Sequence, residues 1–376
     1  MFNSTKMRLG FDAKRAVRNF TGLGNYSRFI IDAIASASPD PLYLYSPKAP
    51  SASIAFPATA RFRHPAKGQW GSYWRSRGIV RDLKRDGIDL FHGLSNELPM
   101  GLRDSGIRSV VTVHDLIFLR FPHYYPWFDR SVYRLKFRYA CRTADRVIAI
   151  SEQTKRDITD FFGIPENRID VVYQDCGDVF KVRYDDAARS AVKKKYDLPE
   201  RFLLNVGTIE DRKNLLLIVQ SLRELPAEVS LVVVGRETPY AAKVRRFIAE
   251  HGLYRRVRFL RDVAYTDLPL IYQLARVFVY PSRFEGFGIP LVEALHSGVP
   301  VIGATGSCLE EAGGPGSLYV GPDDPHALAA AVRSVWNDEA RRSAMIDAGR
   351  EHAGKFSKER IAERLMDIYH QVLNHA

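Results

Sequence analysis

The chain has 376 residues, enough for two domains of ordinary size, and 46% of its residues are hydrophobic. No apolar run approaches the length of a membrane span, and no positively charged start is followed by the long apolar segment of a secretory signal. The three cysteines are too few and too scattered for a disulfide framework or a metal cluster, so we expect reduced thiols and a cytoplasmic protein.

The formal net charge of +12 is unevenly distributed along the chain. Residues 1–180 hold 27 Lys and Arg against 18 Asp and Glu, so most of the surplus lies in the first half. Such a surplus indicates an anionic partner, either a phospholipid surface or a diphosphate-linked acceptor. No nucleic-acid motif accompanies the charge, so we expect no nucleic-acid partner.

Short apolar runs alternate with longer mixed segments through the first half, which predicts parallel strands separated by helices. The predicted strands are Met7–Phe11, Leu42–Tyr45, Leu90–His92, Ser109–Val113, Arg146–Ile150 and Ile169–Val172. The predicted helices are Gly24–Ala37, Gly78–Asp86, Trp127–Thr143 and Glu152–Phe162. Ser151 is placed to cap the last of these helices.

Chemistry-bearing residues follow several of these strands. Gly22 and Gly24 open the first helix, but without a third glycine they do not complete a dinucleotide fingerprint, so a ligand loop and a simple turn both remain open. His114 and Asp115 lie just past a buried strand, where doubly wound sheets bind ligands, which favours a functional role for His114. Asp115 is predicted to orient that histidine or to bind an acceptor. His92 ends another strand, and a structural and an acceptor-contacting role are equally open.

Two segments of the first half interleave aromatic and basic residues. The first contains Trp70 and Trp74, and the second is the predicted helix from Trp127, which carries Arg134 and Arg138. Aromatic residues at helical spacing usually belong to a core and cations to a solvated face. Together they also fit a helix that lies on an anionic membrane, so both interpretations stand.

The second half repeats the alternation of strands and helices, which predicts a second parallel sheet and an α/β fold with two doubly wound, Rossmann-like domains. We expect domains at 1–185 and 186–355, separated near the charged, irregular stretch 181–199, and a final amphipathic helix within 356–376. The predicted strands are Phe202–Val206, Leu231–Val234, Val257–Phe259, Val277–Tyr280, Val299–Ile302 and Leu318–Val320.

The loop after the first of these strands predicts an anion site. It runs from Gly207 and Thr208 to Arg212 and Lys213, just before a helix. Two cations beside exposed helix amides suit phosphate oxygens. The alternative is that both are ordinary surface charges.

The stretch 281–300 places two carboxylates, Glu285 and Glu293, eight positions apart. Glu285 follows a buried strand, Gly288 permits a tight turn, and Glu293 lies one turn into a helix that carries Pro290 in its first turn. Carboxylates accept hydrogen bonds from hydroxyls and amides donate to anionic oxygens, so this geometry suits a polyhydroxylated ligand that carries phosphate.

The run Ser-Arg-Phe-Glu-Gly-Phe-Gly-Ile-Pro-Leu-Val-Glu-Ala-Leu resembles the Glu-x7-Glu signature of retaining glycosyltransferases of family 4, which have the two-domain GT-B fold. The resemblance extends over nearly the whole chain. It implies that Glu285 contacts the hydroxyls of the transferred sugar, that Glu293 holds the nucleotide ribose, and that His114 lies near the reacting carbon. Many members carry arginine where this chain has Thr208, so Arg212 is expected to supply that cation beside Lys213.

The resemblance therefore implies four catalytic residues, His114, Glu285, Arg212 and Lys213. It implies donor contacts from Gly22, Gly24, Gly207, Thr208, Arg212, Lys213, Phe287, Gly288, Ile289 and Glu293. The candidates for acceptor or membrane contact are His92, Asp115, Trp70, Trp74, Arg134 and Arg138. The last helix is expected to pack on the first domain.

The expected function is a retaining hexosyltransferase of bacterial polysaccharide or O-antigen synthesis that uses a nucleotide sugar, with GDP-mannose favoured and a UDP-sugar open. The acceptor is a saccharide or a lipid-linked saccharide. No Asp-x-Asp motif ends a strand, so we expect no cofactor and no metal, with the diphosphate held by cations and amides. The location is expected to be cytoplasmic, with peripheral attachment to the inner face of the membrane open. The alternatives are a sugar-nucleotide 2-epimerase of the same fold and a non-catalytic nucleotide-sugar-binding protein.

Overall fold

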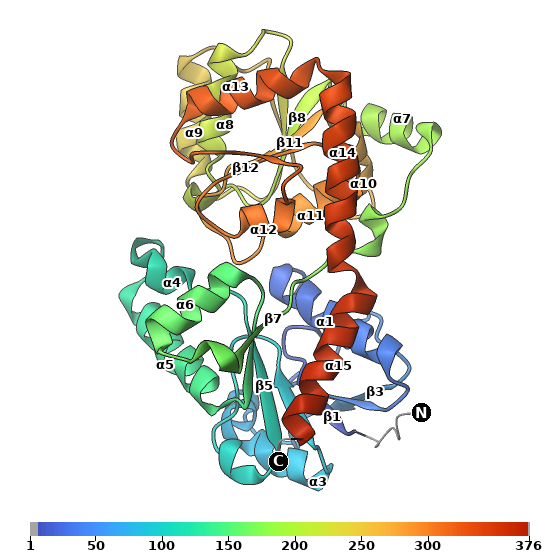
Figure 1. Ribbon diagram of the computed structural model, residues 1–376, viewed down its shortest axis with the longest axis vertical. Helices are drawn as coiled ribbons and strands as arrows, with labels where there is room; N and C mark the ends of the chain where they lie inside the picture. Colours follow the sequence, from blue (N-terminus) through green and yellow to red (C-terminus); the bar gives the residue numbers. More distant parts are fainter. Residues whose placement is uncertain (1–6, 375–376) are drawn as a thin grey trace. The chain divides into compact units, whose positions relative to one another are not determined.

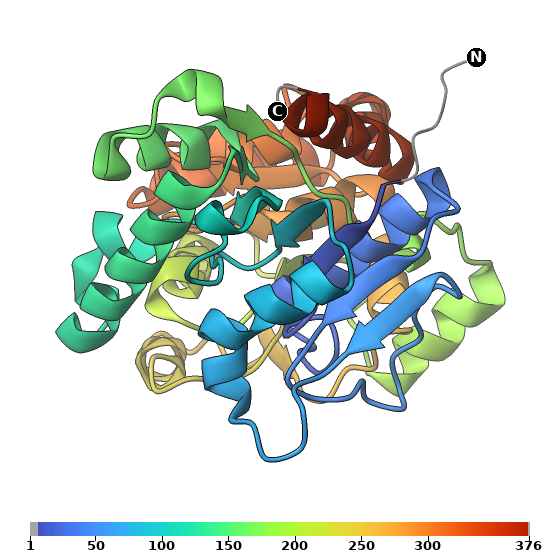
Figure 2. The ribbon, with the colours of Figure 1, turned by 90° about the horizontal axis from the view of Figure 1, so that it is seen from below.

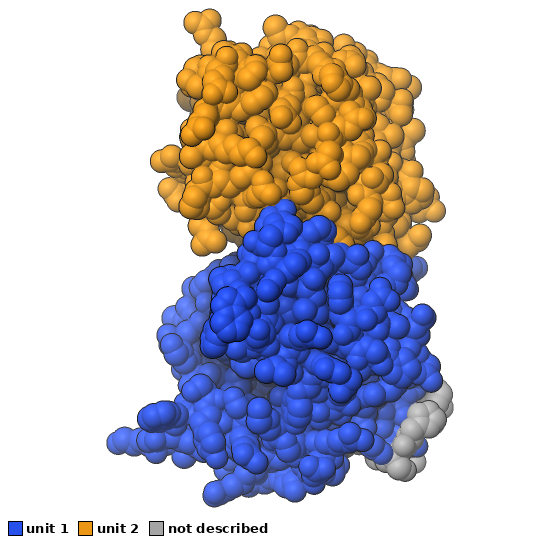
Figure 3. All heavy atoms as spheres, turned by 90° about the vertical axis from the view of Figure 1, so that its left-hand side faces the viewer, with its two compact units in different colours: residues 1–174, 356–376 blue, residues 175–355 orange. Residues whose placement is uncertain are grey.

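The computed structural model describes residues 7–374, which form two compact units (Figures 1 and 3). Unit 1 contains the described residues up to 174 and from 356 onward, and unit 2 contains residues 175–355. The sequence placed the boundary at 185, whereas residues 175–185 belong to unit 2. The physical reason is Phe180, which is fully buried with its ring edge-on to Tyr265 and Tyr272 of unit 2.

Unit 1 is built on a parallel sheet of seven strands in the order β3-β2-β1-β4-β5-β6-β7. The strands are β1 (Leu9–Asp12), β2 (Leu42–Tyr45), β3 (Ala60–Arg63), β4 (Leu90–Gly93), β5 (Arg108–Val113), β6 (Arg146–Ala149) and β7 (Ile169–Val171). The sequence analysis missed β3. This edge strand has the sequence Ala-Arg-Phe-Arg and no fully buried residue, so it lacks the apolar run that marks the other strands.

The helices of unit 1 cover this sheet. They are α1 (Gly22–Ala37), α2 (Gly71–Tyr73), α3 (Ile79–Arg85), α4 (Ile117–Arg120), α5 (Trp127–Thr143), α6 (Glu152–Phe162) and α15 (Lys358–Asn374). The predicted cap is confirmed, because Ser151 Oγ accepts a hydrogen bond from the amide of Thr154 at 3.0 Å. Helix α15 lies along α1 (Figures 1 and 2), and Lys358 Nζ is 2.7 Å from Asp32 Oδ2. The last two residues predicted for this helix, 375–376, lie outside the described residues.

Unit 2 contains a six-stranded parallel sheet in the order β10-β9-β8-β11-β12-β13. Its strands are β8 (Phe202–Val206), β9 (Ser230–Val234), β10 (Val257–Leu260), β11 (Val277–Tyr280), β12 (Val301–Ala304) and β13 (Leu318–Val320). Its helices are α7 (Asp186–Lys195), α8 (Leu215–Ser221), α9 (Ala241–Glu250), α10 (Leu268–Leu274), α11 (Ile289–His296), α12 (Leu309–Gly313), α13 (Pro325–Trp336) and α14 (Glu339–Ala353). None of the described helices is both long enough and apolar enough to cross a bilayer.

Helix α7 corrects the expectation that residues 181–199 are irregular. Asp185 caps its first turn by accepting from the amide of Ala188 at 2.8 Å, and three lysines occupy its last turn. A carboxylate at the start and cations at the end both stabilise the helix dipole. The charges that looked like a linker are therefore the polar face and ends of a short helix.

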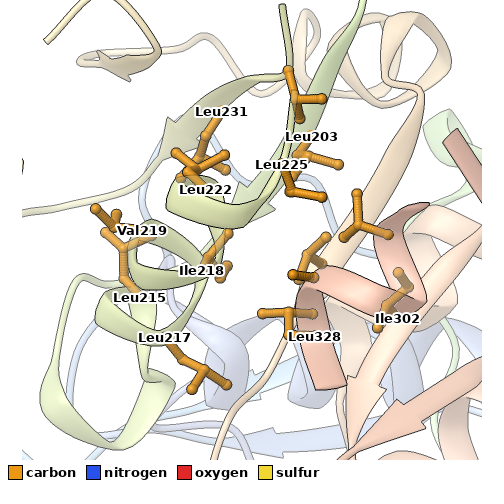
Figure 4. Packing of buried hydrophobic residues seen from close by; sticks show 14 of the residues in the cluster. Leu203, Leu215, Leu217, Ile218, Val219, Leu222, Leu225, Leu231, Ile302 and Leu328 are labelled. Carbon is orange, nitrogen blue, oxygen red and sulfur yellow. The ribbon is translucent and has the colours of Figure 1, made fainter. Parts of the chain in front are cut away.

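The core of unit 2 lies between α8 and the sheet (Figure 4). Leu215 and Ile218 of α8 and Leu222, which directly follows the helix, recur at helical spacing and are at most 1% exposed. They pack in one cluster with Leu203 of β8 and Leu231 of β9. This packing holds the strands rigidly and thereby fixes the position of the loops that leave their carboxyl ends.

Each sheet has a point at which the strand order reverses direction. In unit 1 it falls between β1 and β4, and in unit 2 between β8 and β11. The loops that leave the two strands on either side diverge to opposite faces of the sheet, which opens a crevice at the carboxyl edge. Doubly wound sheets bind their ligands at such points, so these two edges are where each unit is expected to hold a ligand.

Candidate functional site

The candidate active site of unit 2 forms where the loops after β8 and β11 meet at the reversal point of the sheet. Hydrogen bonds tie the two loops together: the amide of Arg283 donates to the carbonyl of Arg212 at 2.8 Å. Asn214 Nδ2 donates to the carbonyl of Pro281 at 3.2 Å. The backbone of Asn214 is left-handed, with φ 59°. This linkage brings residues seventy positions apart in the sequence into one fixed arrangement.

Glu285 lies at the centre of this arrangement, with its side chain 13% exposed. Its Oε2 is 2.8 Å from Arg212 Nη1, and its Oε1 is 3.6 Å from Lys213 Nζ. Tyr280 Oη and Ser282 Oγ donate hydrogen bonds to Oε1 at 2.9 and 2.8 Å. The structure thus brings together the two predicted cations and the first predicted carboxylate.

Charge pairing decides the ionisation of Glu285. Burial raises its pKa, but Lys213 and Arg212, with the hydrogen bonds from Arg212 and Ser282, outweigh burial and lower the pKa to about 2. Arg212 also contacts Glu210, whose side chain is 35% exposed. The buried group of two cations and one carboxylate therefore has one positive charge more than Glu285 balances. Among the described residues, only the partly exposed Glu210 offsets this charge, so an anionic ligand can neutralise it from within the site.

Glu293 lies on α11 in a different environment. Its Oε2 accepts a hydrogen bond from Tyr272 Oη at 2.9 Å. Burial raises its pKa to about 7, although the hydrogen bond from Tyr272 and the charge of Lys213 act in the opposite direction. The two glutamates of the Glu-x7-Glu pair are thus separated in ionisation by their surroundings, one fully charged and one that titrates near neutrality.

This raised pKa predicts a pH dependence of stability. The native state binds a proton at Glu293 more tightly than the unfolded chain, so the group's contribution is fully present below about pH 4.5 and is lost as the pH rises through about 7. The loss should reach about 3 kcal/mol by pH 8, since each pKa unit is worth about 1.4 kcal/mol. Urea unfolding of the nucleotide-free protein between pH 5 and 8 measures it. Glu293→Gln should remove this part of the pH dependence, and identical profiles for both proteins would contradict the assignment.

The turn between the glutamates places backbone amides at the start of α11. Gly288 precedes the helix with φ 114°, a conformation that side chains other than glycine rarely adopt. Pro290 occupies the first turn, as expected. Cys308 Sγ donates to the carbonyls of Glu285 at 3.0 Å and of Phe287 at 3.1 Å, which anchors the turn. The amide of Ile289 therefore belongs to the open end of the helix, where an anion is favoured.

On the other side of this site, the side chain of Lys213 lies over the backbone of Gly207. A Cβ at Gly207 would stand 3.1 Å from Lys213 Nζ, tighter than an ordinary contact, and the backbone there has φ 147°. Thr208 is partly exposed next to it. The glycine thus lets the lysine approach the main chain closely.

In unit 1, His114 follows β5 and is 7% exposed. Burial lowers its pKa to about 4, so the ring is neutral at pH 7. Its Nε2 donates to the carbonyl of Leu94 at 2.9 Å, which leaves Nδ1 as an acceptor. Its amide donates to Asn96 Oδ1 at 2.8 Å, and the ring is edge-on to Tyr26. The side chain is held in one orientation and can accept a hydrogen bond.

For two of the residues predicted to contact an acceptor or a membrane, the structure contradicts the prediction. His92 is fully buried, and its ring nitrogens contact Tyr369 Oη at 2.7 Å and Thr112 Oγ1 at 2.9 Å, so it joins α15 to the sheet. Trp74 is also fully buried, and its Nε1 donates to Asp82 at 2.6 Å. Neither side chain has surface to offer to an acceptor or a membrane.

The remaining candidates in unit 1 are near the surface. Asp115 Oδ1 accepts from the amide of Ile117 at 3.1 Å, which indicates a role at the start of α4. Trp70 is 81% exposed and Arg134 is exposed, whereas Arg138 is partly buried. Gly22 begins α1 in open space.

Gly24, in contrast, is required by the fold. A Cβ at this position would overlap the backbone carbonyl of Asn19, so no other residue fits without moving the turn that precedes α1. Backbone packing therefore requires glycine at this position, whether or not a ligand binds there.

One group of potential metal ligands occurs within residues 7–374, formed by Asp175, Cys176 and His296. The sequence analysis did not foresee it because His296 is remote in sequence. Lys181 Nζ lies 2.5 Å from Asp175 Oδ2 and occupies the position that a cation would take. Burial and the charge of Asp175 raise the pKa of Cys176 well above its ordinary value, so this thiol is a poor ligand.

Sequence reasoning missed two tyrosines that hold the glutamates. Tyr280 Oη accepts from Lys213 Nζ at 2.6 Å while it donates to Glu285. Its place at the end of β11 was a usable signal. Tyr272, which donates to Glu293, lies on α10, and no local pattern marks it.

Two family models match this chain. The model described as "Glycosyltransferase Family 4" matches residues 30–174, and the model described as "Glycosyl transferases group 1" matches residues 188–352. The O-antigen chain mannosyltransferase B of Escherichia coli is 30% identical over 315 residues, which cover 82% of this chain and 78% of that protein. The chain belongs to glycosyltransferase family 4.

Other similar proteins agree with this family-4 assignment. The O-antigen chain mannosyltransferase RfbU of Salmonella typhimurium is 28% identical over 60% of this chain and 60% of its own length. Among solved structures, sucrose-phosphate synthase from Thermosynechococcus elongatus superposes with a TM-score of 0.77 at 21% identity and covers 98% of this glycosyltransferase and 100% of that chain. The two parallel sheets and this likeness confirm the predicted GT-B fold.

Proposed function

We propose that this glycosyltransferase moves a mannosyl residue from GDP-mannose to a saccharide or lipid-linked saccharide acceptor with retention of anomeric configuration. The observation that carries the proposal is the buried cluster of Arg212, Lys213 and Glu285, whose surplus positive charge suits a sugar diphosphate. The names of the similar proteins, O-antigen chain mannosyltransferases, support mannose and surface-polysaccharide synthesis.

In this proposal the two glutamates contact different parts of the donor. Glu285, ionised beside the cations, accepts hydrogen bonds from the hydroxyls of the sugar. Glu293, with a pKa near 7, holds the ribose hydroxyls. Arg212 and Lys213 stabilise the negative charge that develops on the leaving diphosphate, which is the largest contribution expected for such a reaction. The leaving phosphate takes the proton of the acceptor hydroxyl, and the hydroxyl attacks the face from which the phosphate departs.

The amides at the start of α11 and the two cations neutralise the diphosphate without a metal ion in this proposal. A thermal-shift panel of GDP-mannose, UDP-glucose and UDP-galactose in EDTA tests donor and metal together. GDP-mannose should stabilise the protein by about 2.7 kcal/mol at a hundredfold excess over its Kd. NMR of the slowly hydrolysed donor should show α-mannose as the first product. Stabilisation that requires magnesium would overturn the metal-free binding of the diphosphate. A preference for a UDP-sugar would overturn GDP-mannose as the donor, and β-mannose as the first product would overturn retention.

We also propose that unit 1 attaches to the cytoplasmic face of an anionic membrane. On α5, Trp127 is 71% exposed and Phe128 is 63% exposed, and only Ala140 and Cys141 of the helix are buried. Arg134 lies two turns after these aromatic side chains. An exposed helix with aromatic residues and arginines suits the interface between lipid headgroups and acyl chains.

Binding to liposomes should therefore require anionic lipid and weaken as salt increases, because each cation near the surface contributes about 1 kcal/mol within a Debye length. Trp127→Ala with Arg134→Glu should reduce sedimentation with anionic liposomes several-fold. The matched control is Tyr254→Ala with Arg255→Glu in unit 2, which removes an equally exposed aromatic residue and an exposed arginine. Equal binding to neutral liposomes, or equal losses in both variants, would contradict docking through α5.

A further inference from the structure

A small apolar cavity lies at the reversal point of the sheet in unit 1. It is lined by Asp12 at the end of β1, by Phe91 of β4 and the loop that follows, and by side chains from α3, from the helical turn just before it and from α5. This is the edge at which a doubly wound sheet holds a ligand. Neither the donor contacts nor the residues expected to bind an acceptor include any of its lining residues.

The lining divides into an apolar wall and a charged side. The apolar wall is formed by Ile79, Phe91, Leu98, Met100, Leu135 and the ring of Tyr139. On the charged side, Arg75 Nη2 lies 2.6 Å from Asp12 Oδ2, and Arg75 Nη1 pairs with Glu97. Lys136 Nζ is 3.5 Å from Glu97 Oε1. Arg75, the amide of Lys14 and Ser95 Oγ donate to the two oxygens of Asp12, whose side chain is only 5% exposed. Glu97 is 24% exposed, and its oxygens retain lone pairs for hydroxyl donors.

The volume of the cavity, about 170 Å³, decides what it can hold. Sites that enclose a whole small molecule have roughly 300–1,000 Å³, so a disaccharide does not fit inside. A cavity of about 150 Å³ with apolar walls is large enough for benzene. The space therefore suits a short length of hydrocarbon and not a sugar.

The mouth of the cavity is also apolar. Met100 and Leu135 line it and are 54% and 72% exposed. Leu135 lies on α5, the helix that carries exposed Trp127 and Phe128. Arg134 and Lys136 flank Leu135 in the sequence and complement an anionic linkage such as a phosphate. Hydrocarbon surface beside cations matches an aliphatic chain attached to a phosphate.

We propose that this cavity binds the first units of the aliphatic chain of a lipid-linked saccharide acceptor, with Glu97, whose side chain is 24% exposed, in reach of the hydroxyls of its sugar. The inference rests on the proposed function and narrows its acceptor to one with an aliphatic aglycone. The sugar stays outside the cavity, at the charged side, and the hydrocarbon packs inside it against the apolar wall.

Calorimetric binding of octyl and methyl mannoside, below the micelle concentration of the octyl compound, tests the proposal. Each methylene moved from water into the cavity strengthens binding about fourfold, so the octyl compound should bind at least about tenfold more tightly. Ile79→Trp, which fills the cavity, and Met100→Asp, which places a charge at its mouth, should each reduce this preference to about twofold or less. Phe128→Asp is the matched control, because Phe128 is exposed on the same helix but does not line the cavity, and it should keep the preference.

An unchanged circular dichroism spectrum and unfolding temperature show that each variant is folded. Met100→Asp changes an exposed side chain should Ile79→Trp fail to fold. Equal affinities for octyl and methyl mannoside in the unaltered protein, or an octyl preference that survives both cavity variants, would overturn the proposal. Binding requires no turnover. A chain preference in a protein that transfers no sugar would therefore refute the proposed function alone, whereas transfer without a chain preference would refute the cavity assignment alone.

Discussion

Replacement of Glu285 by Gln should lower kcat by about 10²–10³-fold or more, because the carboxylate that braces the sugar in the transition state becomes a neutral amide. The affinity for GDP should be kept or should increase. Glu285 pairs with both Arg212 and Lys213, so loss of its charge leaves both cations to the diphosphate. Steady-state kinetics and calorimetric titration with GDP measure the two effects separately.

Glu210→Gln is the matched control for this change. Glu210 also contacts Arg212, at 2.6 Å, but its side chain is 35% exposed, whereas that of Glu285 is 13% exposed. We expect its kcat to fall by less than about tenfold, because a partly solvated ion pair contributes little. Glu293→Ala should instead weaken GDP itself. Parallel losses of GDP affinity in the Glu285 and Glu293 variants would contradict the division of the donor between the two glutamates.

Replacement of Lys213 by Met should weaken GDP binding at least about tenfold and lower kcat/KM by about 10³-fold. Burial lowers the pKa of Lys213, but the charge of Glu285 and the contact with Tyr280 raise it above its ordinary value, so the ammonium group stays charged at any working pH. Its Nζ is 2.6 Å from Tyr280 Oη and 5.1 Å from the centre of that ring, which fixes the charge in place before the donor arrives. A preorganised charge of this kind stabilises a developing anion strongly.

Arg283→Met is the matched control for Lys213→Met. It removes one positive charge near Glu285 in the sequence but leaves the ammonium group of Lys213 in place. Arg283 is close in sequence to Glu285, but its guanidinium pairs with Asp323 and its side chain is 32% exposed. GDP affinity should change by less than about threefold in this variant. A loss as large as that of Lys213→Met would mean that general electrostatic attraction, rather than the fixed ammonium group, binds the diphosphate. An unchanged affinity in Lys213→Met would remove this residue from the site.

Local patterns in the sequence were sufficient for the framework of the fold. Strands β8 and β11 and helix α6 have the predicted bounds, because an apolar run between turn residues and a capped amphipathic segment are short-range properties. The same holds for the cap at Ser151 and for Pro290 in the first turn of α11. Where the local pattern was weak, in the polar edge strand β3 and the charged helix α7, the prediction failed.

Only the tertiary structure decided how the chemistry-bearing residues are buried and paired. Trp74 and His92 were indistinguishable from ligand contacts in the sequence, but tertiary packing buries both, and His92 contacts Tyr369 near the end of the chain. Glu285 and Glu293 look equivalent eight positions apart. The packing of the loop after β8 places two cations beside one glutamate, and α10 encloses the other with a tyrosine, so one pKa falls to about 2 and the other rises to about 7. Ionisation depends on burial and on neighbouring charges in space, and for Glu285 these neighbours, Arg212 and Lys213, are more than seventy positions away in the sequence.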